Sequence, residues 1–263
     1  MNRDSRGRRD VLKGISALGA VAVFRCGGTA AADGGAISNG ACVLDPTVTR
    51  GPFWVDERLQ RSDVRSDTSG RASPNPRPGV PLALRFALSS FGASTCAPLA
   101  GAMVDIWQCD AAGIYSDVAG TSAGQNFLRG YQTTDASGIA SFTTIYPGWY
   151  PGRAVHIHVK VRLFDSMLRA TRSARRRQSP LLPPADNVTT EATTQVFFDD
   201  TVSDAVFRAA APYNSRPARD TRNAADGLYG GRTVLLASLQ GDPASGYSAT
   251  FPLAVRLGQV NAG

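Results

Sequence analysis

Histidine and cysteine are scarce in this chain, whose 263 residues include two histidines and four cysteines. Three of the cysteines, Cys42, Cys96 and Cys109, show no Cys-x-x-Cys spacing, which argues against a zinc site built from thiolates. In an oxidising compartment we expect one disulfide and one free thiol among these three. The spacing does not tell which pair forms the bridge.

Long apolar runs are also missing, because the stretch 15–24 is too short to span a bilayer as a helix. It follows the basic run Arg8-Arg9-Asp10-Val11-Leu12-Lys13 and precedes small residues at 29–32, which is the order of an export signal. The Arg-Arg pair followed by Val-Leu-Lys resembles a twin-arginine signal. We therefore expect an export signal at 1–32, a flexible lead-in at 33–41, and a periplasmic or secreted protein. A disordered basic N-terminus is the alternative.

Acidic residues are fewer than basic ones, and the formal net charge is +7. Residues 1–32 hold six basic and two acidic side chains, so +4 of that charge belongs to the expected signal. The remaining charge of about +3 is unremarkable for a domain of this size and predicts no nucleic-acid partner.

Short runs of alternating polarity dominate the rest of the sequence. Residues 81–88 place a large apolar side chain at every second position, as one face of a β-strand does. Similar strand-like runs occur at 102–109, 139–145, 154–160, 193–198, 233–239 and 247–257. Turns rich in Gly, Pro and Asp separate them, and helical patterns are few. We predict a mainly β fold, a β-sandwich with long ordered loops and little helix.

Both histidines lie in the predicted strand 154–160, where they alternate with Val and Ile residues. His156 and His158 therefore project from one face. Burying two unpaired imidazoles would cost free energy, and neutral imidazole is the commonest metal ligand. Tyr150 and Arg153 lie just upstream on a turn rich in Pro and Gly. The pattern favours a metal site, and the alternative is a pair of core histidines that hydrogen-bond to each other.

Several longer motifs accompany this strand. They are GAMVDIWQCDAAGIYS (101–116), LRGYQTTD (128–135) with Gly138, TIYPGWY (144–150) and RAVHIH (153–158). In order and spacing they resemble the intradiol ring-cleavage dioxygenases, and the β subunits of protocatechuate 3,4-dioxygenase most of all. The arm TRGPFWVD (49–56) is similar to the Thr-Glu-Gly-Pro-Tyr-Tyr segment of that family. The resemblance covers most of 42–257, so we expect the catalytic domain at 42–263.

The resemblance implies a mononuclear non-haem Fe(III) held by two tyrosinates and two histidines, which correspond here to Tyr115, Tyr150, His156 and His158. Phenolate is a hard, strongly donating ligand that favours Fe(III), and imidazole suits iron as well. A trivalent ion also lowers the pKa of a phenol enough to ionise it at neutral pH. Ordinary packing of the two tyrosines as aromatics is the alternative.

The implied reaction is cleavage of a catechol-type ring by O2 between the two hydroxylated carbons, giving a cis,cis-muconate-type diacid. Tyr150 corresponds to the ligand that the substrate displaces. Arg153 matches the family arginine three residues before the first ligand histidine and would stabilise developing negative charge. Gln195 matches a glutamine near the O2 and substrate pocket, or else makes a hydrogen bond at the end of a sheet.

An arginine- and proline-rich segment at about 165–190 departs from the family pattern, because it places Gln195 37 positions after His158. A solvated insertion, a lid over the pocket and an anion-binding patch are all consistent with its composition. Two further function classes stay open: an exported β-sandwich that binds aromatic polymers or sugars without catalysis, and an envelope interaction module that uses this basic segment. The resemblance to a β subunit requires no α partner, so we expect a monomer or homo-oligomer.

Overall fold

Strand β1 (Pro81–Phe91) shows how the alternating sequence produces a two-sided sheet. Leu82, Leu84 and Phe86 are at most 1% exposed and belong to the hydrophobic core, while Arg85 between them is exposed. Successive side chains of a strand point to opposite faces, so one face of β1 is apolar and the other is solvated. Strand β6 (His156–Phe164) differs, because it is buried at every position.

The computed structural model describes residues 48–91, 96–118, 120–164, 188–229, 235–236 and 238–256. All of them belong to the unit formed by residues 36–263. The expected export signal at 1–32, the lead-in at 33–41 and most of the insertion at 165–190 lie outside the described residues. No helix in the described part of the chain is long and apolar enough to cross a lipid bilayer.

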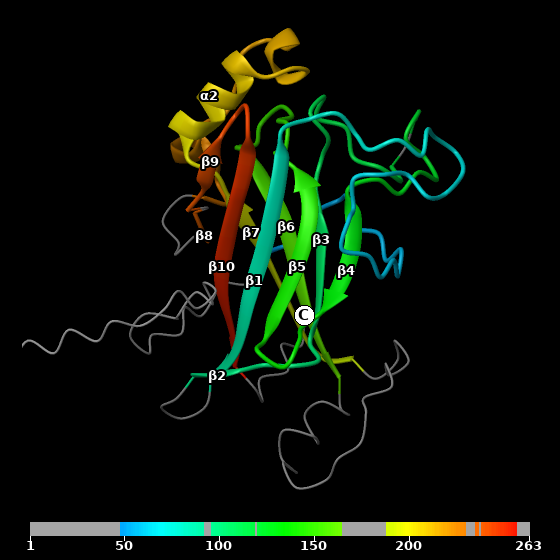
Figure 1. The fold of residues 1–263 in the computed structure, drawn as a ribbon, viewed down its shortest axis with the longest axis vertical. Helices are drawn as coiled ribbons and strands as arrows, with labels where there is room; N and C mark the ends of the chain where they lie inside the picture. Colours follow the sequence, from blue (N-terminus) through cyan, green and yellow to red (C-terminus); the bar gives the residue numbers. More distant parts are fainter. Residues whose placement is uncertain are drawn as a thin grey trace, which may run out of the picture. The chain divides into compact units, whose positions relative to one another are not determined.

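The first sheet is organised around β1 (Figure 1). Strand β10 (Gly246–Arg256) runs parallel to β1, and β9 (Gln240–Asp242) continues the sheet beside β10. On its other side β1 pairs with two antiparallel strands, first with β5 (Ile139–Ile145) and at its end with β2 (Cys96–Pro98).

The second sheet positions the histidines. Its strands, in spatial order, are β4 (Arg129–Thr133), β3 (Met103–Trp107), β6 (His156–Phe164), β7 (Val188–Phe197) and β8 (Leu235–Leu236). The central strand β6 is antiparallel to β3 and β7, and its register places Trp107 and Gln195 directly opposite His158 on either side. Directly paired residues share a face, so these three side chains project together.

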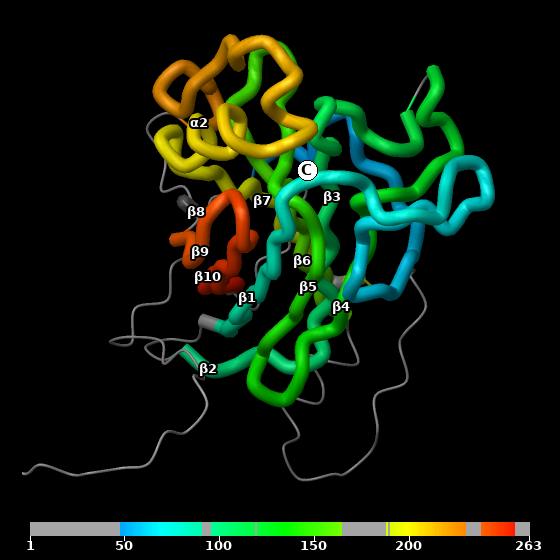
Figure 2. The backbone as a smooth tube through the Cα atoms, turned by 45° about the horizontal axis from the view of Figure 1, so that its top comes forward, coloured from blue at the N-terminus to red at the C-terminus, as the bar shows by residue number. Residues whose placement is uncertain are grey.

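The two sheets pack face to face, with the core between them (Figures 1 and 2). Leu84 and Phe251 of the first sheet and Ile157 and Val159 of the second belong to this one cluster. Helix α2 (Asp200–Ala209) lies at one end of the strands (Figure 1). The predicted mainly β sandwich with little helix is confirmed, and the histidine face of β6 is the face turned away from this core.

Some strand boundaries differ from the predicted ones, because hydrogen-bonded pairing with a neighbouring strand sets where a strand begins and ends. Strand β6 begins at His156 rather than 154 and runs on to Phe164, and β7 begins at Val188 because it pairs along the whole of β6. Residues 188–190 thus belong to a strand and not to the predicted insertion. Strands β2, β4 and β9 and helix α2 were not predicted. The sequence of β4, Arg-Gly-Tyr-Gln-Thr, shows no apolar alternation, because its pairing with β3 sets its position.

The two described cysteines differ. Cys96 is disulfide-bonded. Cys109 is a buried free thiol, and burial raises its pKa to about 12. A thiol held neutral in this way is a packing group rather than a nucleophile.

Candidate metal centre

The two histidines project from the outer face of β6 and meet at their Nε2 atoms. His156 Nε2 and His158 Nε2 are 3.1 Å apart, and both side chains are at most 2% exposed. The loops that follow β3 and β5, together with the arm 48–56, cover this face. Two buried imidazoles are therefore turned toward one point beneath a cover of loops.

Both predicted tyrosines reach the same point. The hydroxyl of Tyr150 lies 3.2 Å from His156 Nε2, and that of Tyr115 lies 3.5 Å from it. Glycines allow the two loops to approach, because a Cβ at Gly113 would lie 2.2 Å from the carbonyl oxygen of Trp149. The predicted residues Tyr115, Tyr150, His156 and His158 are thus brought together by the fold.

The tautomer of His156 follows from its second nitrogen. Its Nδ1 lies 2.7 Å from the carbonyl oxygen of Ala154, which only accepts, so Nδ1 carries the proton and Nε2 presents its lone pair. Burial, followed by the positive charge of Arg153, lowers the pKa of His156 to about 3. Burial also lowers the pKa of His158 well below its usual range. Both rings are neutral, as metal ligands must be.

His156 Nε2 is surrounded by more polar groups than it can form hydrogen bonds with. His158 Nε2, the two phenol oxygens and Arg153 Nη1, the last at 3.5 Å, all face this one nitrogen. A neutral imidazole nitrogen has one lone pair and accepts one good hydrogen bond. A pair of core histidines satisfying each other would not require two phenols at the same place. The arrangement is that of donors gathered around a shared ion.

The spacing of the donor atoms fits such an ion. With metal–ligand bonds of about 2.0–2.2 Å, neighbouring donors lie roughly 2.8–3.6 Å apart for bond angles of 90–110°. The separations of 3.1, 3.2 and 3.5 Å from His156 Nε2 lie in that range. The described residues contain no cluster of three or more His, Cys, Asp or Glu side chains, so the usual zinc donor sets are not found among them.

The chemistry of the two phenols narrows the choice of ion. Burial raises the pKa of Tyr115 well above its ordinary value and also raises that of Tyr150. Ionising them requires a strongly polarising cation, and phenolate oxygen prefers hard, highly charged ions. Two imidazoles and two phenols therefore fit Fe(III).

Arg153 and Gln195, the other predicted site residues, lie beside these donors. Arg153 Nη1 is 3.4 Å from the Tyr150 hydroxyl, and its Nη2 donates to Oε1 of Gln195. Gln195 lies in β7 directly opposite His158, so it shares a face of the sheet with that histidine. Its Nε2 atom is buried and has no hydrogen-bond partner among the described residues.

Sequence reasoning missed Asp226, which fixes Arg153. Its Oδ2 atom accepts from Arg153 Nε at 2.9 Å and from the backbone N–H of Ala154 at 2.8 Å. Burial opposes ionisation of Asp226, but backbone N–H groups and Arg153 outweigh it, and the net effect is a lowered pKa. The only local signal was an Asp-Gly pair typical of a turn, which says nothing about a partner 73 residues away.

Phe53 was also missed as a site residue. Its ring stacks on Tyr115 at a centroid distance of 4.3 Å and meets Tyr150 edge-on at 5.6 Å. The motif similarity identified the arm but assigned it no contact. Tyr146, in contrast, lies only four residues before Tyr150 yet points into the core, where its hydroxyl is 2.8 Å from that of Ser203.

Comparisons with known proteins identify a family for this chain. The model of the family described as "Dioxygenase" matches residues 51–213. An intradiol ring-cleavage dioxygenase from Tetranychus urticae has a similar structure, with a TM-score of 0.64 and 28% identity over 84% of this chain and 98% of the other. Catechol 1,2-dioxygenase from Pseudomonas arvilla C-1 shares the fold at 21% identity and a TM-score of 0.52, over 82% of this chain and 63% of the other.

A curated relative gives a shorter match. Catechol 1,2-dioxygenase from Candida albicans is 43% identical over 54 residues, which make up 20% of this chain and 18% of that protein. The family match, by contrast, covers more than half of the chain and includes all four converging donors. This chain belongs to the intradiol ring-cleavage dioxygenases.

Proposed function

We propose that this protein is an Fe(III)-dependent dioxygenase that cleaves a catechol-type ring between its two hydroxylated carbons with O2, giving a cis,cis-muconate-type diacid. The observation that carries the proposal is the convergence of Tyr115, Tyr150 and His158 on the single lone pair of His156. Family membership supports the class of reaction, and the two phenols with two imidazoles support Fe(III) as the metal.

The residues that would hold the ion are Tyr115, Tyr150, His156 and His158. When bound, Fe(III) supplies Lewis-acid chemistry that withdraws electron density from a chelated catechol and opens a ring carbon to O2. The two phenols then have different roles, because Tyr115 is buried beneath Phe53 whereas Tyr150 is only partly buried. Tyr150 would therefore be the donor that gives way to substrate, and its oxygen would take up a substrate proton.

Arg153 and Gln195 act on charge and orientation. The guanidinium of Arg153 lies beside the Tyr150 oxygen, where a fixed cation stabilises negative charge on the phenolate or on the substrate that replaces it. Its ion pair with Asp226 holds it in place before substrate arrives. The free Nε2 amide of Gln195 is a donor for a substrate or O2 oxygen at the same face.

Export belongs to the same proposal. The twin-arginine-like sequence within 1–32 supports an exported enzyme that meets catechols outside the cytoplasm. Fusing residues 1–41 to a reporter, with Arg8→Lys and Arg9→Lys together as the control, tests this. Export of the control fusion at the wild-type level would contradict a twin-arginine route.

An oxygen electrode tests the enzymatic proposal. Iron-replete protein is supplied with catechol, protocatechuate, hydroxyquinol or a larger lignin-like catechol, and the ring-opened product is identified by mass. We expect one O2 consumed per diacid formed with at least one of these substrates. The variant Tyr150→Phe should lose this activity. Tyr146→Phe is the matched control. It also removes a tyrosine hydroxyl between β5 and β6, but that hydroxyl bonds to Ser203 in the core and not to the site.

Two results would contradict the proposal. One is the absence of O2 uptake with every catechol tested, and the other is equal activity of Tyr150→Phe and Tyr146→Phe. Aromatic ligands that still bound without O2 uptake would instead favour a non-catalytic binding protein.

A further inference from the structure

The two histidines of the site are held in different ways. His156 donates from Nδ1 to the carbonyl oxygen of Ala154, which fixes its ring plane. Metal-binding histidines usually make such a bond from the nitrogen that does not bind the metal, because the bond orients the ring. His158 lacks it, since its Nδ1 atom is buried and has no hydrogen-bond partner among the described residues. Something else must set the plane of His158.

Trp107 is placed to do this. Its ring lies flat against the His158 ring, with centroids 4.6 Å apart and planes within 10° of each other. The pairing of β3 with β6 sets Trp107 directly opposite His158, so the backbone enforces the contact. A ring confined by a flat neighbour can still rotate within its plane but cannot tilt away from it, and tilting is the motion that would carry Nε2 out of the donor cluster.

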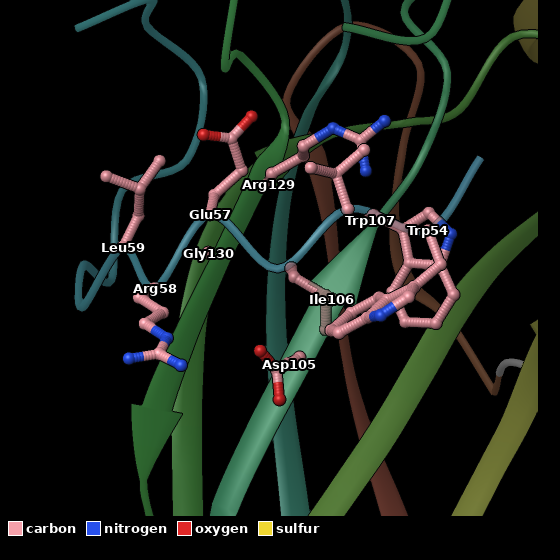
Figure 3. A pocket seen from close by; sticks show the side chains of 10 residues that line it. Trp54, Glu57, Arg58, Leu59, Asp105, Ile106, Trp107, Arg129 and Gly130 are labelled. Carbon is pink, nitrogen blue, oxygen red and sulfur yellow. The ribbon is translucent and has the colours of Figure 1, made fainter. Parts of the chain in front are cut away.

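A further aromatic side chain fixes Trp107. Trp54 of the arm meets it edge-on at a centroid distance of 4.7 Å (Figure 3). The Lys160 ammonium lies 4.5 Å from the Trp54 ring. The cavity between the arm and β3, lined in part by both tryptophans, has a volume of about 10 Å³, which leaves room for one water at most. The stack His158–Trp107–Trp54 is therefore closely packed from the donor cluster to the arm.

We infer that Trp107 is a positioning residue for His158, and that its stacking takes the place of the hydrogen bond that His156 donates to the carbonyl oxygen of Ala154. The inference rests on the proposed iron site and adds to it a residue whose ring stacks on His158. Trp54 supports the same stack one layer further out. Flatness, rather than size or polarity, is the property that Trp107 must supply.

Three variants test this: Trp107→Phe keeps a flat ring, Trp107→Leu removes it, and Phe142→Leu removes a buried aromatic from β5 in the other sheet. Iron release to a chelator should be about 10- to 100-fold faster in Trp107→Leu, the usual cost of losing a group that orients a metal ligand. Trp107→Phe should rescue most of that loss, and Phe142→Leu should release iron at the wild-type rate.

A metal-free measurement separates this inference from the proposed function. The chain has two histidines, so ring NMR signals can be assigned to one or the other in apoprotein. We expect Trp107→Leu to shift the signals of His158 and leave those of His156 in place. Wild-type protein that binds no iron would overturn the proposed function. The NMR measurement needs no iron and reports on the stacking of Trp107 on His158 directly. Unchanged His158 signals, or iron release as fast in Trp107→Phe or Phe142→Leu as in Trp107→Leu, would overturn the positioning role.

Discussion

The outer face of β6 carries four polar side chains at alternate positions, and its two halves are built on opposite plans. In the second half each cation has an acidic partner: Lys160 lies 2.8 Å from Glu191, and Arg162 lies 2.6 Å from Asp105 and 3.0 Å from Asp56. In the first half the described residues show no ion pair to His156 or His158, and both rings are neutral.

One half of the strand therefore stabilises the fold, whereas the other half carries the candidate metal donors. Buried polar groups in proteins are normally paired, so the ion pairs of the second half need no function beyond joining β6 to its neighbouring strands and to the arm. In the first half, one lone pair on His156 Nε2 faces the two tyrosine hydroxyls and His158 Nε2, although it can accept only one good hydrogen bond. We call the paired second half complete, and the first half, whose donors fit a metal ion, incomplete.

Removing a donor from the incomplete half should have the largest effect. His156→Ala leaves the sheet intact but takes away the nitrogen on which the other donors converge. We expect iron content near zero and turnover reduced by more than the roughly 100-fold that loss of a ligand's hydrogen-bond partner costs. Metal analysis and O2 uptake measure this, with circular dichroism as the check on folding. A variant that keeps its iron and its activity would break the comparison.

Breaking the complete half should instead affect stability. Arg162→Leu leaves Asp105, which is 6% exposed, without its main partner, so the free energy of unfolding should fall by about 3–5 kcal/mol. Arg65→Leu is the control, because it breaks an exposed pair with Asp63 that is worth about 0–1 kcal/mol. Urea denaturation gives both values. An equal fall in the free energy of unfolding in the two variants would show that the halves are not distinct. A lower iron content per folded molecule in Arg162→Leu would show the same.

A smaller effect is expected from Asp226→Asn, which weakens the hold on Arg153 without touching a donor. We expect kcat to fall about 10- to 100-fold while iron content stays at the wild-type level. Asp220→Asn serves as the control, because exposed Asp220 accepts from the N–H of Gly152 in the same loop but does not contact Arg153. An Asp220 variant as impaired as the Asp226 variant would assign the effect to the loop and not to Arg153.

The smallest effect concerns pH. The pKa of Asp226 is lowered in the folded protein, from an ordinary value of 3.8, so its contribution to stability is present above that value. That contribution is lost as the pH falls through the lower, folded pKa. The stability gap between wild type and Asp226→Asn should therefore be constant from pH 6 to 5 and narrow below pH 4. Denaturation curves across this range measure it, and a gap that widened on acidification would contradict the assignment.

How much the sequence could predict depends on the range of the interactions involved. The period of two is a local property, so alternation placed β1, β5 and the two histidines on strands. Tyr115 and Tyr150 lie on loops with no periodic signal, and the resemblance to a family identified them. Asp226 could not be predicted because its contact with Arg153 depends on how distant loops fold. The same holds for the stacking of Trp107 on His158, which depends on the register between β3 and β6.

The most direct test of the central claim is the metal content and visible spectrum of the full chain, purified from cells grown with both iron and zinc. One Fe(III) per chain should give a red protein, because tyrosinate-to-iron charge transfer absorbs visible light. Adding catechol without O2 should shift that absorption as Tyr150 gives way. A colourless protein that holds zinc or no metal, with Tyr115 and Tyr150 still protonated, would contradict the account.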